Sequence, residues 1–150
     1  MIGINDMIKN ILKSESMKNK LELKHLAAYL PYNLKVTFEH DEEHTHDLVG
    51  LNYNWQGVDL ISEFGDFGRA EIKLVKPMVR PLSQLEKEIE YNGGSFVPYR
   101  KLHDITDFHH TPLTVEKYPT EMPYDVVEKL FEWHFDVFGL IDKGLAVPLT

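Results

Sequence analysis

Histidine and carboxylate side chains gather in one short segment, the eight residues from His40 to Asp47. His44 and His46 are two residues apart, so in an extended strand their imidazoles lie on the same side. Imidazole and carboxylate groups placed in this way bind divalent transition metals. The spacing therefore allows a metal site, although a cupin-type pattern would require a glutamate a few residues later, where this chain has Gly50.

A second polar cluster lies in a proline-rich region further along the chain and consists of His103, Asp104, Asp107, His109 and His110. If the two clusters met, they would form a dinuclear metal centre of the kind that activates water for hydrolysis. Five histidines are the candidate ligands of this alternative: His40, His44, His46, His103 and His109. We favour the simpler interpretation that both clusters are solvated loops, with no catalytic residue, metal ligand or cofactor, because turns are usually polar. The first cluster is accordingly expected to be a hairpin loop between two strands.

Two further polar residues are expected to have structural roles. His134 lies on the apolar face of a predicted helix, where a histidine is usually a core residue with hydrogen-bonded ring nitrogens. Arg80 is expected to pair with a carboxylate such as Glu88 or Asp136. Short motifs elsewhere, such as the kinase-like tripeptide at residues 66–68, lack the surrounding signatures that would give them chemistry.

Composition and charge exclude several classes of protein. The chain has 150 residues, enough for one domain with a substantial core, and it is 43% hydrophobic and 11% aromatic, which is too apolar for a disordered chain. Its 24 acidic and 16 basic residues give a net charge of −8, which argues against general nucleic-acid binding. Cysteine is absent. No run approaches the roughly 20 apolar residues of a membrane span, and no signal-peptide pattern is present, so we expect a cytoplasmic protein without membrane contact.

The elements that position these residues can be predicted from periodicity. Residues 1–20 are expected to form an amphipathic extension and a linker, either packed on the domain or acting as a docking arm, and residues 21–150 to form a single α+β domain. Period-two alternation predicts four strands, joined as a small antiparallel meander, at 34–38, 49–56, 58–60 and 70–74. A fifth strand is expected at 113–118. We expect this sheet to pack against a buried C-terminal helix and one or two shorter helices.

Capping signals predict the two main helices. The first runs from Ser83, which has capping-box spacing to Glu86, to a left-handed stop at Asn92. The second spans residues 123–138, with a proline at its first position and a glycine just past its end. This second helix is so apolar that it must be covered by the sheet or by another subunit.

Three stretches of the sequence resemble a family of short uncharacterised proteins from Bacteroidetes genomes and their phages or prophages. They are YLPYNLKV (29–36), VRPLSQLEKEIEYNGGSFVP (79–98) and VVEKLFEWHFDVFGLIDKGLA (126–146). The family has no established activity, so the resemblance implies a setting rather than a set of site residues. That setting is an accessory protein of a phage or mobile element in a bacterial cytoplasm, or a small virion component.

The sequence thus favours a non-catalytic interaction module whose partner is another protein or a second copy of the same chain. The missing catalytic signature and the apolar C-terminal helix carry this prediction. Two alternatives stay open. One is the metal-dependent hydrolase described above, and the other is an acidic DNA mimic that inhibits a host enzyme, which the charge of −8 suggests.

Overall fold

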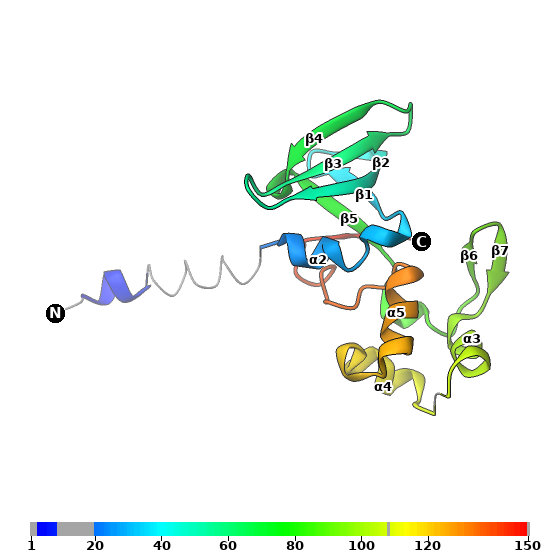
Figure 1. Ribbon diagram of the computed structural model, residues 1–150. Coiled ribbons are helices and arrows are strands. Elements are labelled where there is room, and N and C mark those ends of the chain that lie inside the picture. Colours follow the sequence, from blue (N-terminus) through cyan, green and yellow to red (C-terminus); the bar gives the residue numbers. More distant parts are fainter. Residues whose placement is uncertain (1–2, 9–19, 108, 150) are drawn as a thin grey trace.

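The computed structural model describes residues 3–8, 20–107 and 109–149 of the chain (Figure 1). Strands and short helices are mixed, so the predicted α+β class is confirmed. The strands are β1 (Lys35–Phe38), β2 (Asp41–Asn52), β3 (Gly57–Ser62), β4 (Phe67–Glu71), β5 (Val75–Val79), β6 (Ile89–Tyr91), β7 (Gly94–Phe96) and β8 (Val147–Pro148). The α-helices are α2 (Leu23–Ala27), α3 (Pro98–Ile105), α4 (Pro112–Lys117) and α5 (Tyr124–Glu132). Short 3₁₀ turns are η1 (Leu30–Tyr32), η2 (Ile72–Leu74), η3 (Leu82–Gln84) and η4 (Pro119–Glu121).

Six strands form the main sheet in the order β4-β3-β2-β1-β5-β8. All neighbours are antiparallel except β5 and β8, which run parallel. The alternation seen in the sequence sets one buried face, on which Leu48 lies opposite Leu60 and Val58 lies opposite Ala70. The predicted antiparallel meander is therefore confirmed for β1 to β4, and the strand boundaries differ by a few residues.

The histidine-rich segment, predicted to be a hairpin loop, is mostly strand. Only Glu39 and His40 form the turn, and β2 begins at Asp41. Along this strand, His46 pairs with Val36. The prediction was wrong because ladder hydrogen bonds join main-chain groups, so a run of polar side chains can continue a strand whose side chains face solvent.

The predicted helix from Ser83 to Asn92 is not formed beyond the single turn η3. Asn92 and Gly93 instead form the turn of the β6–β7 hairpin, with φ values of 50° and 78°. Asn-Gly with both residues at positive φ is the preferred two-residue turn between antiparallel strands, since its twist matches that of the strands. The same dipeptide that was interpreted as a helix stop is thus a hairpin turn.

A strand that the sequence did not predict, β5, contains Pro77.

Two further expectations fail in the C-terminal half. The strand predicted at 113–118 is wrong, because residues 113–117 belong to helix α4, which starts at Pro112 and is capped by the Thr111 side chain. The helix predicted for 123–138 ends at Glu132, because His134 adopts the left-handed conformation with φ of 62°. Directly after it, Phe135 forms an isolated parallel bridge with Arg80, and the chain turns again from Val137.

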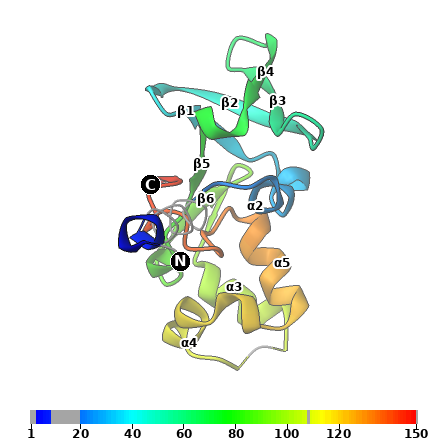
Figure 2. The ribbon, with the colours of Figure 1, turned by 90° about the vertical axis from the view of Figure 1, so that its left-hand side faces the viewer.

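Two hydrophobic clusters form the core. The first lies between the main sheet and α2 and includes Leu26, Tyr29 and Val36. The second surrounds α5, whose Val126 and Leu130 are fully buried, together with α3, α4 and the β6–β7 hairpin (Figure 2). The apolar excess of the C-terminal helix is therefore covered within the chain itself.

The N-terminal extension is described only in part. Residues 4–8 are helical, and Ile4, Met7 and Ile8 are exposed. The rest of this predicted amphipathic helix and most of the linker, residues 9–19, lie outside the described residues. Across the described ranges, we find no helix that combines the length and the apolar character of a membrane span.

Candidate functional site

The two histidine clusters lie in different parts of the molecule. His40, His44 and His46 belong to the β1–β2 hairpin of the main sheet, whereas His103 is in α3 and His109 follows it. In both views the hairpin and α3 are at opposite ends of the molecule (Figures 1 and 2). Within residues 3–8, 20–107 and 109–149, no three histidine, aspartate or glutamate side chains are close enough together to hold a metal ion.

The other three candidate ligands, His46, His103 and His109, each have a local contact instead. His46 packs edge-on against Phe38, with 5.0 Å between ring centroids. The ring of His103 lies 4.8 Å from that of Tyr99 in the same helix. On the surface, His109 Nε2 lies at hydrogen-bond distance, 2.9 Å, from the carboxylate of Asp107. The dinuclear centre of the hydrolase alternative is therefore not assembled by the described residues.

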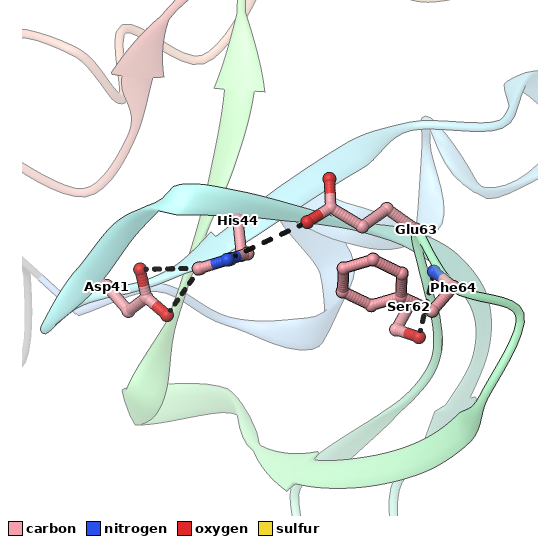
Figure 3. A network of polar contacts seen from close by, with 5 residues as sticks. All are labelled: Asp41, His44, Ser62, Glu63 and Phe64. Carbon is pink, nitrogen blue, oxygen red and sulfur yellow. Dashed lines mark hydrogen bonds and ion pairs between the residues drawn. The ribbon is translucent and has the colours of Figure 1, made fainter.

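The tip of the main sheet, which we define as residues 39–44 and 62–67, brings two hairpin turns together (Figure 3). His44 Nδ1 lies 3.0 Å from the carboxylate of Asp41, and His44 Nε2 lies 3.9 Å from that of Glu63. The second turn is closed by the hydroxyl of Ser62, which accepts hydrogen bonds from the backbone of Phe64 and Asp66. His44 thus connects the β1–β2 turn with the β3–β4 turn.

The electrostatics of this contact follow from its exposure. The hydrogen bond and charge of Asp41, with a smaller contribution from Glu63, raise the pKa of His44 above its ordinary value. His44 in turn lowers the pKa of Asp41. Both groups face solvent, where ion pairs contribute little to stability. A histidine held between two solvated carboxylates orients the two turns relative to each other.

Exposed aromatic side chains are the other feature of the tip. Phe64 is 78% exposed and Phe67, the first residue of β4, is 61% exposed. Strand β4 pairs only with β3, so it is an edge of the sheet. An edge strand presents main-chain N–H and C=O groups that can pair with another chain. Sequence reasoning missed these two phenylalanines, although a Phe-Gly-Asp-Phe turn between strands was a visible signal of exposed aromatic side chains.

A second polar site forms where η1, the end of β5, the end of β6 and the end of α5 converge. The predicted partners of Arg80 were wrong, because its guanidinium donates to the carbonyl oxygens of Trp133 and Glu90, both at 3.0 Å. The carboxylate of Asp136 instead accepts the backbone N–H groups of Leu140 and Ile141. A carbonyl oxygen carries partial charge only, so Arg80 has no ionic partner among the residues that the structure describes.

His134 has the hydrogen-bonded ring that the sequence predicted. Its Nε2 donates to the carbonyl oxygen of Tyr32 at 2.6 Å. Burial is the largest cause that lowers the pKa of His134 below 6.5, and the nearby charges of Arg80 and Lys35 lower it further. The imidazole is therefore neutral in the folded protein at pH 7, with Nδ1 left as an acceptor.

We expect this shift to appear in the pH dependence of stability. The unfolded chain takes up a proton at His134 near pH 6.5 and the folded chain does so only at lower pH, so acid favours unfolding. The neutral His134 ring therefore contributes fully to the stability of the folded protein above pH 6.5, and this contribution is lost as the pH falls below that value. Urea unfolding of wild type and His134→Asn should give a difference in free energy of unfolding that shrinks between about pH 7.5 and pH 5. A constant difference would contradict the burial of a neutral ring.

Comparison with known proteins adds no functional assignment. The chain matches no protein-family model, no curated protein and no solved structure.

Proposed function

We propose that this protein is a non-catalytic interaction module that binds an extended, apolar and basic segment of a partner protein along strand β4. The observation that carries the proposal is the exposure of Phe64 and Phe67 beside an unpaired sheet edge. The partner segment would add a strand next to β4 by main-chain hydrogen bonds, and its alternate side chains would contact the two phenyl rings. The C-terminal helix, on which the sequence-based argument rested, is not part of this proposal, because its apolar side chains are buried within the chain.

Charge supports the basic character of the partner. The tip that carries the two phenylalanines also contains six carboxylates: Glu39, Asp41, Glu42, Glu43, Glu63 and Asp66. The single arginine of β4, Arg69, pairs with Asp59 at 3.1 Å and lies over the Phe67 ring, 5.7 Å from its centroid. The tip therefore combines negative charge with exposed apolar side chains. Lysine or arginine in the partner would meet complementary charge, which raises the rate and specificity of association.

The same charges disfavour a second copy of the chain as the partner. In a two-fold antiparallel pairing of β4 strands centred on Arg69, the two guanidinium groups would face each other, and like charges directly opposite are destabilising. A register centred on Phe67 brings the acidic turns of both copies closer together, and a register centred on Glu71 places two carboxylates opposite each other. We therefore propose a different protein as the partner, in the setting of a phage or mobile-element accessory protein that the sequence resemblance implies.

The DNA-mimic alternative has weaker support. Mimicry needs carboxylates spread over one face at phosphate-like spacing. Outside the tip, surface carboxylates alternate with basic groups in ion pairs such as Lys24–Glu22 and Lys73–Glu71. This mixture reduces the continuous negative potential that a nucleic-acid-binding enzyme would recognise.

The test places a photo-crosslinking residue at the proposed surface. A benzoylphenylalanine in place of Phe67, expressed in host cells, should crosslink one dominant protein, and the same residue in place of Tyr124, which is 82% exposed on α5, should not. With the identified partner purified, Phe67→Ala should weaken binding at least about tenfold, because a buried aromatic anchor usually contributes more than 1 kcal/mol. Tyr124→Ala is the matched control and should bind like wild type.

Two further measurements test the mode of binding. Amide hydrogen exchange should slow in β4 on complex formation, since a new strand pairs its free backbone groups. Glu42→Lys at the tip should weaken binding, and Asp142→Lys far from the tip should not. If the two crosslinking positions give the same products, or if Phe67→Ala binds as tightly as wild type, β4 is not the binding surface. A complex that contains only this chain would replace the proposed partner by a second copy.

A further inference from the structure

A pocket of about 510 Å³ lies at the convergence of η1, β5, β6 and α5. Its lining includes Arg80, Tyr91 and His134, and the turn residues Asn33 and Asn92. We propose that this pocket binds a small organic oxyanion, either a carboxylate or a phosphate monoester, with its anionic group on the Arg80 guanidinium. The volume falls within the range of known small-molecule sites, roughly 300–1,000 Å³.

Arg80 is the main reason to expect an anion in this pocket, because it is a buried cation without a counterion among the described residues. The residue is only 8% exposed, and within the described ranges no carboxylate lies within ion-pair distance of it. Nε and Nη2 donate to main-chain carbonyl oxygens. For Nη1 the described residues provide no such acceptor, and Arg80 lines the pocket. Buried charges in proteins are normally paired, and an anion in the pocket would complete this one.

The neighbouring charges define which anion fits. Lys35 also lines the pocket and pairs with Asp47, and Glu132 pairs with Lys129 at 2.8 Å, so both pairs are internally compensated. Glu90, an exposed residue, also lines the pocket and adds one carboxylate to its surroundings. This carboxylate repels a dianion more strongly than a monoanion. We therefore expect monoanions to bind better than dianions of the same size.

Ring systems in the lining favour an organic ligand over an inorganic one. The Tyr91 and His134 rings meet edge to face, with centroids 6.3 Å apart and an interplanar angle of 77°. Because His134 is neutral, it does not compete with Arg80 for the anion. A flat apolar body next to the oxyanion would pack on these rings, as aromatic pairs do elsewhere in proteins.

The experiment titrates the full chain with probes of known charge and follows backbone amides by NMR. Benzoate should shift the amides of Asn33, Asn92 and His134 saturably, with half-maximal effect below about 10 mM. Phenyl phosphate serves as the second organic oxyanion, and comparison with benzoate tells carboxylate from phosphate recognition. Inorganic phosphate should need a higher concentration, and the cation benzylamine should give no saturable shift.

Variants assign the binding to the guanidinium. Arg80→Gln keeps an N–H donor for the main-chain carbonyl oxygens and removes the charge, so benzoate should bind at least about tenfold more weakly. Arg69→Gln, a surface arginine of β4, is the matched control and should not change binding. If Arg80→Gln does not fold, Tyr91→Ala should weaken benzoate binding several-fold. The proposal is overturned if neither aromatic oxyanion saturates, if benzylamine binds equally well, or if the folded pocket variants bind benzoate like wild type.

Discussion

Phe135→Ala is expected to lower the free energy of unfolding by about 3–5 kcal/mol, the usual cost of truncating a buried aromatic side chain. Phe135 is fully buried and is one of the largest enclosed side chains in the described part of the molecule. It follows the end of α5 and packs in the second hydrophobic cluster. Its main-chain oxygen also accepts a hydrogen bond of 2.6 Å from Tyr29, which belongs to the first cluster. The residue therefore connects the two halves of the core.

Urea unfolding followed by tryptophan fluorescence measures this loss, with Trp133 as a buried reporter. Tyr124→Ala is the control, since Tyr124 is 82% exposed and its truncation should change stability by less than about 0.5 kcal/mol. A loss below about 1 kcal/mol for Phe135→Ala would mean that this position is not part of a packed core.

Asp136→Ala is expected to have the second largest effect, a loss of about 2–4 kcal/mol, because it orphans two backbone donors. The carboxylate of Asp136 is buried and accepts hydrogen bonds from Leu140 at 2.7 Å and Ile141 at 2.9 Å. These bonds hold the turn through Gly139 that returns the chain to the sheet. After truncation the two N–H groups lose this acceptor, and the N–H of the fully buried Leu140 is left without a partner.

Chemical denaturation again provides the measurement, and Asp142→Ala provides the control, because Asp142 is exposed a few residues away. Asp136→Asn should recover part of the loss, since one amide oxygen can still accept a hydrogen bond. Equal stabilities of Asp136→Ala and Asp142→Ala would show that the turn is held by other contacts.

Strand periodicity carried the part of the fold that the sequence predicted well. In β3, the buried Val58 and Leu60 alternate with the half-buried Asp59, because one face of the sheet is covered more fully than the other. In β1 the residue types alternate in the same way, although Thr37 is buried as well as Val36. Residues such as Val36 and Leu60 therefore signal both their strand and their face. The antiparallel order of β1 to β4 followed from the short turns between them.

The wrong secondary-structure predictions share one physical cause. The same short sequence pattern is compatible with more than one structure, and tertiary contacts decide which one forms. Asn92-Gly93 ends a helix or turns a hairpin, and only the pairing of Ile89 with Phe96 decides between them. The apolar run after Pro123 continues as a helix in isolation, but the main-chain hydrogen bonds between Arg80 and the chain at His134 to Asp136 draw it into a β-bridge. Such contacts join residues more than 50 positions apart, which no local window detects.

The candidate sites were harder to predict than the fold. The histidines drew attention because of their type, yet His44 and His103 have local contacts in separate regions. Arg80 was noticed, and its assigned partners were wrong, since the sequence does not reveal that carbonyl oxygens rather than carboxylates surround it. The exposure of Phe67 depends on β4 being the last strand of the sheet, which is a property of topology alone.

The two edges of the main sheet differ in a way that limits growth. At the edge opposite β4, the parallel strand β8 consists of two residues, and one of them is Pro148, which has no N–H to donate. A filament requires each subunit to offer two complementary ends, and in the main sheet as described the β8 edge is too short to be the second. Strand addition at β4 therefore terminates after a single event, so an aromatic edge can stay exposed without seeding fibres.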